Sequence, residues 1–145
     1  MRNFRNIKAW QSADDLAVKI YSRSKLFPKE ELYSMVSQIR RAAISIPTNI
    51  AEGASREHKR EYLHFLYIAR GSMAETEYLL HLSHRLKYLN QNEYQEIESI
   101  RGETAKMLSG LITSVKKEAS FISDLLAMIT SSIFISGFRF FEFSS

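Results

Sequence analysis

Residues 38–53 read QIRRAAISIPTNIAEG, and their spacing predicts an amphipathic helix. Apolar side chains recur at three- and four-residue steps through this stretch and just before it, which places them on one helical face. They are Leu32, Met35, Val36, Ile39, Ala42, Ala43, Ile46 and Ile50. We predict a helix over about residues 30–53, with Gly53 as its C-terminal cap. Pro47 should bend this helix without ending it, because the periodicity resumes at Ile50.

Three more helices are predicted on either side of this stretch, over about residues 7–26, over about residues 59–88, and from about residue 91 to residue 117 or beyond. The first has an apolar stripe of Trp10, Ala13, Leu16, Ala17, Ile20 and Tyr21. Asn90 and Glu93 have the spacing of a capping box before the last helix. The third helix is apolar over a face wide enough for two neighbours or another subunit. Short connections then favour an all-α, antiparallel up-down-up-down four-helix bundle.

The last part of the chain differs in composition. We divide the chain into a bundle domain, residues 1–118, and a hydrophobic C-terminal extension, residues 119–145, which carries three charged residues. We expect the last helix to end near Ser131, followed by a poorly ordered or partner-bound end. Residues 138–143 nearly alternate and could equally form a short strand. The uncharged run of residues 125–138 is too short to span a bilayer, so no membrane association is predicted.

The charge is unevenly distributed along the 145 residues. Residues 1–60 have twelve Lys and Arg against six Asp and Glu, a balance of +6, within a net charge of +4. A basic first half favours an anionic partner such as nucleic acid, and a mixed-charge solvated surface is the alternative. The chain has no cysteine, and residues 1–10 lack the apolar core of a signal peptide. A cytoplasmic location is therefore expected.

No constellation of catalytic, metal-binding or cofactor-binding residues is evident. Glu61 and His64 form one Glu-x-x-His pair, but the second pair that a di-iron bundle needs is missing. His81 and His84 could share a metal with Glu77, although histidines on the protein surface are the simpler interpretation. No glycine-rich phosphate loop or nucleophile elbow is present. We predict that the protein is not an enzyme and has no cofactor or metal.

The helical wheel of residues 38–53 also has a polar side. Arg41, Ser45, Thr48 and Glu52 fall on one strip, and Asn49 lies at the edge of the core, where its amide needs a partner. This strip is either a solvated face or a second buried surface. In the second case its arginines would pair with glutamates or with an anionic ligand.

The run RRAAISIPTNIAEG at residues 40–53 closely resembles the signature of the four-helix bundle proteins encoded in intervening sequences of bacterial 23S rRNA genes. Trp10 with Ala13, Phe27-Pro28, and the run IARGS at residues 68–72 match the same pattern. The resemblance covers about residues 4–115 and stops before the hydrophobic extension. The family often has glycine where Lys87 stands.

The resemblance implies a ring-shaped homopentamer without established enzymatic activity. The accessory proteins of diversity-generating retroelements are similar in fold, and they bind reverse transcriptase and nucleic acid through a basic pentameric surface. Three functions are left open. One is an oligomer that binds RNA or DNA through a basic face, and another is an adaptor for a protein such as a reverse transcriptase. The third is a structural assembly with Arg40, Arg41, Glu52 and Glu75 buried between subunits. The candidate nucleic-acid or assembly surface is Arg40, Arg41, Asn49, Glu52, Arg56 and Glu75.

Overall fold

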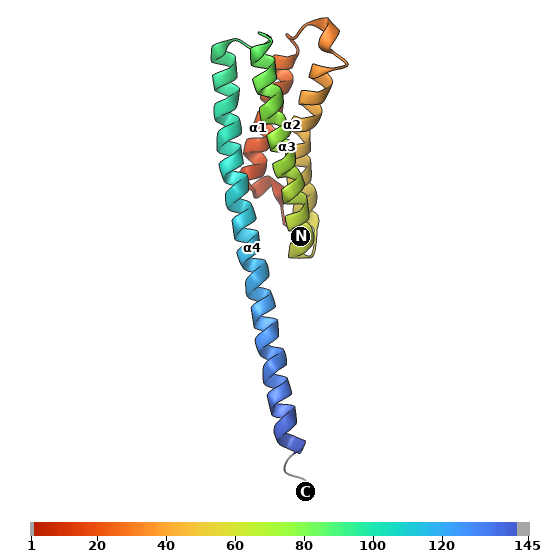
Figure 1. Cartoon of the computed structure of the whole chain (residues 1–145), viewed down its shortest axis with the longest axis vertical. Helices are drawn as coiled ribbons and strands as arrows, with labels where there is room; N and C mark the ends of the chain where they lie inside the picture. Colours follow the sequence, from red (N-terminus) through yellow and green to blue (C-terminus); the bar gives the residue numbers. More distant parts are fainter. Residues whose placement is uncertain (1, 142–145) are drawn as a thin grey trace.

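The computed structural model describes residues 2–141, with side chains for residues 2–123 and 125–130. Its four helices are α1 (Lys8–Ser24), α2 (Met35–Ser55), α3 (Lys59–Arg85) and α4 (Gln91–Phe141) (Figure 1). Two short 3-10 turns, η1 (Phe4–Asn6) and η2 (Lys29–Glu31), precede α1 and α2. No strand occurs within residues 2–141. The all-α, four-helix prediction is confirmed.

Contacts between the helices show that neighbours run antiparallel. As residue numbers rise along one helix, the numbers of their partners fall along the next, and Figure 1 shows the same alternation. The pairs are Ser12–Thr104 and Arg23–Glu93 between α1 and α4, Ser45–Ser72 and Arg41–Glu75 between α2 and α3, and Glu77–Arg101 and Lys59–Glu118 between α3 and α4. Helix α2 continues through Pro47, as its periodicity predicted.

The apolar faces predicted from the sequence meet at the centre of the bundle. Most of the predicted stripe of α2 is buried, and so is that of α3. The side chains with 0–1% exposure on these two helices are Ile39, Ala42, Ala43, Ile46, Ile50, Ala54, Tyr62, Leu66, Ala69, Thr76, Leu80 and Ser83. Burying a Leu or Ile side chain of this kind contributes about 1.5–3 kcal/mol to folding. This core holds the outward-facing side chains of α2 in fixed positions.

Helix α2 begins later than predicted, at Met35 instead of near residue 30. Ser34 has φ −117° and ψ −99°, a conformation outside the helical region, so η2 and α2 are separate elements. The side chain of Glu31 stabilises this break. Its carboxylate accepts hydrogen bonds from the Ser34 hydroxyl and, at 3.3 Å, from the Met35 backbone N–H. This local bonding satisfies a backbone donor that the first turn of α2 would leave free.

The prediction that Gly53 caps α2 is wrong. The helix continues to Ser55, and no glycine in residues 2–141 has a positive φ. Gly53 is buried because α3 packs against it. A Cβ added here would lie 2.8 Å from Tyr62 Cδ2 and 2.9 Å from Phe65 Cβ. Glycine is therefore required at this position for close packing rather than for turn geometry.

The alanine substitutions of two helical glycines should change stability in opposite directions. Gly53→Ala should destabilise the protein by about 1–2 kcal/mol, because the new methyl overpacks the Tyr62 and Phe65 contact. Gly71→Ala is the matched control, since nothing lies within 4 Å of its added Cβ, and it should stabilise α3 by about 0.5–1 kcal/mol. Urea unfolding of both variants measures the difference. Equal shifts of the same sign would contradict the packing described here.

The connection between α3 and α4 follows known helix-end chemistry. Helix α3 ends at Arg85, slightly earlier than predicted, and Lys87 has φ 64°. Tyr88 N–H donates to Ser83 O and Lys87 N–H to His84 O, both at 2.9 Å, which is the bonding of a Schellman motif. Asn90 and Glu93 form the predicted capping box through reciprocal bonds of 3.0 and 2.9 Å.

Helix α4 extends well past the other three helices (Figure 1). Val115 is buried and Ala119 is half-buried, but every side chain described from Ser120 to Thr130 is exposed. The helix continues to Phe141, beyond the predicted end near Ser131, and the strand alternative is wrong for residues 138–141. Residues 142–145 lie outside the described part of the chain. Among residues 2–141, no helical segment combines the length and hydropathy needed to cross a bilayer.

Candidate nucleic-acid interface

Five of the six residues proposed from the sequence lie along one line of contact between α2 and α3. We call this line the seam and define it by Arg41, Ser45, Asn49, Glu52, Arg56, Ser72 and Glu75. At its centre the Ser45 and Ser72 hydroxyls are 2.8 Å apart. The Asn49 amide donates to Ser45 O at 2.7 Å and to Ser45 Oγ at 3.0 Å. The polar groups at the centre of the seam therefore find partners within the chain.

The arginines of the seam are paired with acidic side chains. Arg41 lies 3.8 Å from Glu75, and Arg56 is paired with Glu52 one helical turn away. The Arg41 side chain is 70% exposed and that of Glu75 is 47% exposed. Exposed pairs of this type contribute about 0–1 kcal/mol, so they position the charges more than they stabilise the fold. Within one chain, none of these four side chains is buried.

Arg40 lies away from the seam, on the side of α2 that faces α1. Its Nε donates to Ser24 Oγ at 2.8 Å, and its guanidinium lies 4.9 Å from the centre of the Tyr21 ring. Ser24 is at the last turn of α1, so this contact ties the end of α1 to α2. The two adjacent arginines therefore have different partners within the chain.

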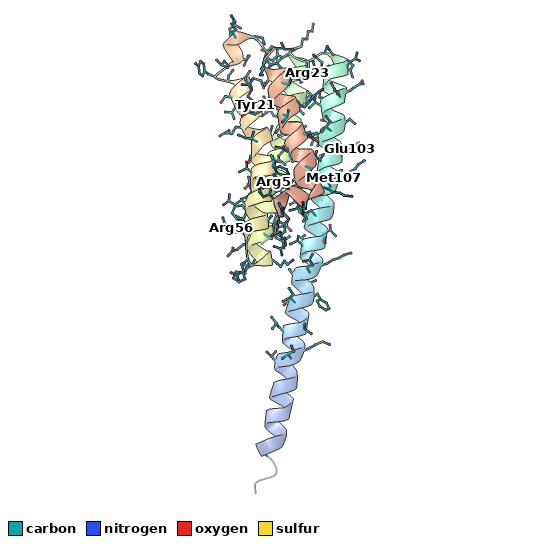
Figure 2. All side chains as sticks on the ribbon, turned by 180° about the vertical axis from the view of Figure 1, so that it is seen from behind. Arg5, Tyr21, Arg23, Arg56, Glu103 and Met107 are labelled. Carbon is teal, nitrogen blue, oxygen red and sulfur yellow. The ribbon has the colours of Figure 1, made fainter. Side chains whose placement is uncertain are left out.

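Two adjoining surface hollows lie where α1 ends and α2 begins, and they share Leu32, Val36 and Arg40. Together we call them the basic hollow. The remaining lining residues are Ser24, Lys25, Phe27, Pro28 and Lys29 in one part, and Tyr21, Tyr33, Ser37, Arg41 and Ile44 in the other. Four of its lining residues are cationic and none is acidic. Tyr21 marks this region in Figure 2, toward the end of the bundle opposite the projecting part of α4.

Two residues of the basic hollow that the sequence predicts in the core are exposed. Tyr21 and Leu32 fit the apolar stripes of the first two helices, but they are 37% and 48% exposed. The stripes end at the α1–α2 connection, where no further helix covers these side chains. Lys25, Lys29 and Tyr33 were not identified as functional candidates. The available signal was the pair of lysines on either side of Phe27-Pro28.

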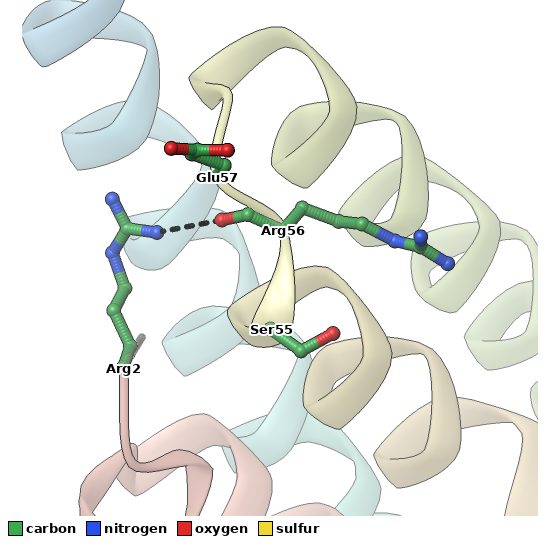
Figure 3. Close-up of a pocket in the computed structure, with 4 residues that line it drawn as sticks. All are labelled: Arg2, Ser55, Arg56 and Glu57. Carbon is green, nitrogen blue, oxygen red and sulfur yellow. Dashed lines mark hydrogen bonds between the residues drawn. The ribbon is translucent and has the colours of Figure 1, made fainter.

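A further hollow at the other end of the bundle is less suited to an anion. Arg2, Ser55, Arg56 and Glu57 line it (Figure 3), so it contains an acidic side chain. Arg2 Nη1 donates to Arg56 O at 3.5 Å, and the Arg56 side chain points away from Arg2. The two cations therefore do not converge on one ligand position.

No group of three or more His, Asp or Glu side chains in the described part of the chain is arranged to hold a metal. The His84 side chain packs within the protein. Its Nδ1 lies 3.1 Å from Leu89 O, and its ring stacks on Tyr94 with centroids 4.6 Å apart. These contacts tie His84, in the last turn of α3, to the α3–α4 connection and to the start of α4.

The position of η2 beside the basic hollow depends on a carboxylate. Glu31 accepts hydrogen bonds from Ser34 and, at 2.8 Å, from the Tyr88 hydroxyl on the α3–α4 connection. Hydrogen bonds from Ser34, Tyr88 and the Met35 N–H hold the pKa of Glu31 below its ordinary value. The bond from Tyr88 connects η2 to the α3–α4 connection.

The lowered pKa of Glu31 predicts a pH dependence of stability. The native state favours the ionised carboxylate, so this stabilisation is present above a pH of about 4.5 and is lost as the pH falls through the folded-state pKa. Urea unfolding between about pH 5 and pH 3 should show a smaller loss of stability in Glu31→Gln than in the wild type. Glu57→Gln is the control, because no hydrogen bond or ion pair reaches Glu57 among the described residues. An unchanged pH profile in Glu31→Gln would contradict this role.

The fold and the site define the class of the protein as an antiparallel four-helix bundle with a basic hollow at one end. The model of the 23S rRNA-intervening sequence protein family matches residues 5–110, and the chain belongs to this family. The chain is also similar to the crystal structure of a protein of unknown function from the S23 ribosomal protein family of Bacteroides thetaiotaomicron. That match has 30% identity and a TM-score of 0.67, and it covers 72% of this chain and 97% of the other. No curated protein matches the chain. Neither match names an enzymatic activity.

Proposed function

We propose that this protein is a non-enzymatic RNA-binding protein and that the basic hollow is its binding surface. The observation that carries the proposal is the lining of the hollow by Lys25, Lys29, Arg40 and Arg41 with no acidic side chain. A nucleic acid binds tightly to a surface whose cationic side chains replace the counterions condensed on its phosphates. The family name connects these proteins to rRNA genes. That name describes where their genes lie, and the ligand has to be measured.

The cations of the basic hollow are available to a ligand. Lys25, Lys29 and Arg40 have no acidic partner within 4.0 Å among the described residues, although Arg40 donates to Ser24 Oγ. Arg41 makes an exposed contact with Glu75 and donates to the Gln38 side chain. By contrast, Arg101 is 12% exposed and is held by Glu98 and Glu77 between α3 and α4. Lys25 and Lys29 in particular can exchange water and ions for phosphates at little cost in internal bonds.

RNA binding by the purified full chain tests this proposal. Fluorescence anisotropy of a labelled RNA of about 12 nucleotides, at about 50 mM salt, should show saturable binding. A protein partner recovered in place of RNA, with no binding to any RNA at low salt, would overturn the proposal.

A second candidate function is self-assembly through the seam. Ile44 and Ile68 are exposed beside Ser45 and Ser72, so apolar side chains flank a polar contact that is already satisfied. Such a surface can be covered by a second copy without leaving buried polar groups unpaired. Light scattering should then give about five times the monomer mass, the pentamer that the family resemblance implied, and Ile68→Glu should lower it. A monomer mass for the wild type would exclude this assembly.

A further inference from the structure

We infer that the basic hollow binds single-stranded RNA by stacking bases on its tyrosines, rather than duplex RNA by its phosphates alone. This inference rests on the proposed function and specifies its ligand. The basic hollow combines the two features found where proteins bind single strands, which are aromatic platforms and a surrounding positive charge.

Tyr33 is the most exposed large apolar side chain of the described residues, at 91%. It lies between η2 and α2, in the short connection that Glu31 holds in place through Ser34 and Met35. A fully solvated aromatic ring gives no packing energy to the fold, so its removal should leave the bundle intact. Its position in the lining of a cationic hollow makes it available to stack on a base.

Tyr21 offers a second ring whose position is already fixed. The Arg40 guanidinium lies 4.9 Å from its centroid and is itself held by Ser24 Oγ at 2.8 Å. The ring therefore loses little conformational freedom when a ligand binds. The exposed side chains of Leu32 and Ile44 extend the apolar surface around the two rings.

The cations lie on both sides of this apolar surface. Lys25 and Lys29 flank Phe27-Pro28 in one part of the hollow, and Arg41 lies on α2 in the other. A single strand can place its bases on the rings and its phosphates near these cations. A duplex keeps the faces of its bases stacked inside, so it would leave the tyrosines and Leu32 uncovered. The apolar part of the hollow therefore selects for unpaired bases.

Two probes separate this inference from the proposed function. One is an RNA strand of about 12 nucleotides without self-complementarity, and the other is the duplex that it forms with its complement. Anisotropy at low salt should show at least about tenfold tighter binding of the single strand by the full chain. Failure to bind either probe would overturn the proposed function, whereas equal or tighter binding of the duplex would overturn this inference alone.

Tyrosine variants supply the second test. Tyr33→Ala should weaken single-strand binding roughly 5- to 150-fold, from about 1–3 kcal/mol per stacked base, and should leave duplex binding unchanged. Tyr33→Phe should keep the wild-type affinity because it keeps the ring. Tyr78→Ala, which removes an exposed tyrosine of α3 outside the basic hollow, is the matched control. Circular dichroism confirms that the variants fold. Wild-type affinity in Tyr33→Ala would overturn the inference.

Discussion

Tyr62→Ala should destabilise the bundle by about 3–5 kcal/mol, the largest loss expected for a single substitution in this chain. Tyr62 is 1% exposed and is the largest fully buried side chain of the described residues. It packs on Gly53 from α3, and the Arg2 guanidinium lies 5.0 Å from the centre of its ring. Removal of the ring would leave a cavity next to a glycine, which has no side chain to fill it. Chemical denaturation followed by circular dichroism measures the loss.

Tyr62→Phe is the control that separates the ring from its hydroxyl. The hydroxyl oxygen is buried and has no hydrogen-bond partner among the described residues. Its burial also raises the pKa of Tyr62. An unsatisfied buried polar group costs about 1–3 kcal/mol, so its removal should leave stability unchanged or increase it. A clear loss of stability in Tyr62→Phe would show that the hydroxyl is satisfied after all.

Charge reversal in the basic hollow should produce the largest effect on RNA binding. Lys25→Glu combined with Lys29→Glu should lower affinity on the order of 10- to 100-fold at low salt, because two phosphate contacts become repulsive. Both lysines lack an acidic partner among the described side chains, so the bundle loses no ion pair. Anisotropy with the single-stranded RNA probe measures the change.

Lys106→Glu combined with Lys117→Glu is the matched control for net charge. These exposed lysines lie on α4, outside the basic hollow, and the double substitution changes the net charge by the same amount. Charges farther away than a Debye length of about 10–14 Å are largely screened at this ionic strength. The control should therefore lose less than about threefold in affinity. Equal losses in the two variants would place RNA binding elsewhere.

Much of the fold could be predicted from the sequence because the hydrophobic periodicity and the capping residues agree with the burial seen in the bundle. The stripe that includes Ile39, Ile46 and Ile50 lies in the core, and Asn90 and Glu93 cap α4 as their spacing indicated. The errors lie where a tertiary contact overrides a local signal. Gly53 has the sequence context of a helix cap, but α3 packs against it and α2 continues.

The candidate site was harder to predict than the fold. Arg40 and Arg41 both line the basic hollow, but the helix directs them to different partners, Ser24 on α1 and Glu75 on α3. Lys25 and Lys29 reach the same hollow as Arg41 only because α1 and α2 fold back on each other. The periodicity of the sequence shows on which face of its own helix each residue lies. It does not show which faces of two helices come together, because that depends on how the helices pack in the bundle.

The salt dependence of RNA binding tests the central claim most directly. If the four cations of the basic hollow each contact a phosphate of a single strand, log K should fall with log salt at a slope of about −2.8, from about −0.7 per contact. Affinity should then drop about 50-fold between about 50 and 200 mM salt. Absence of binding at the lower salt concentration, or an affinity that does not change with salt, would contradict the account.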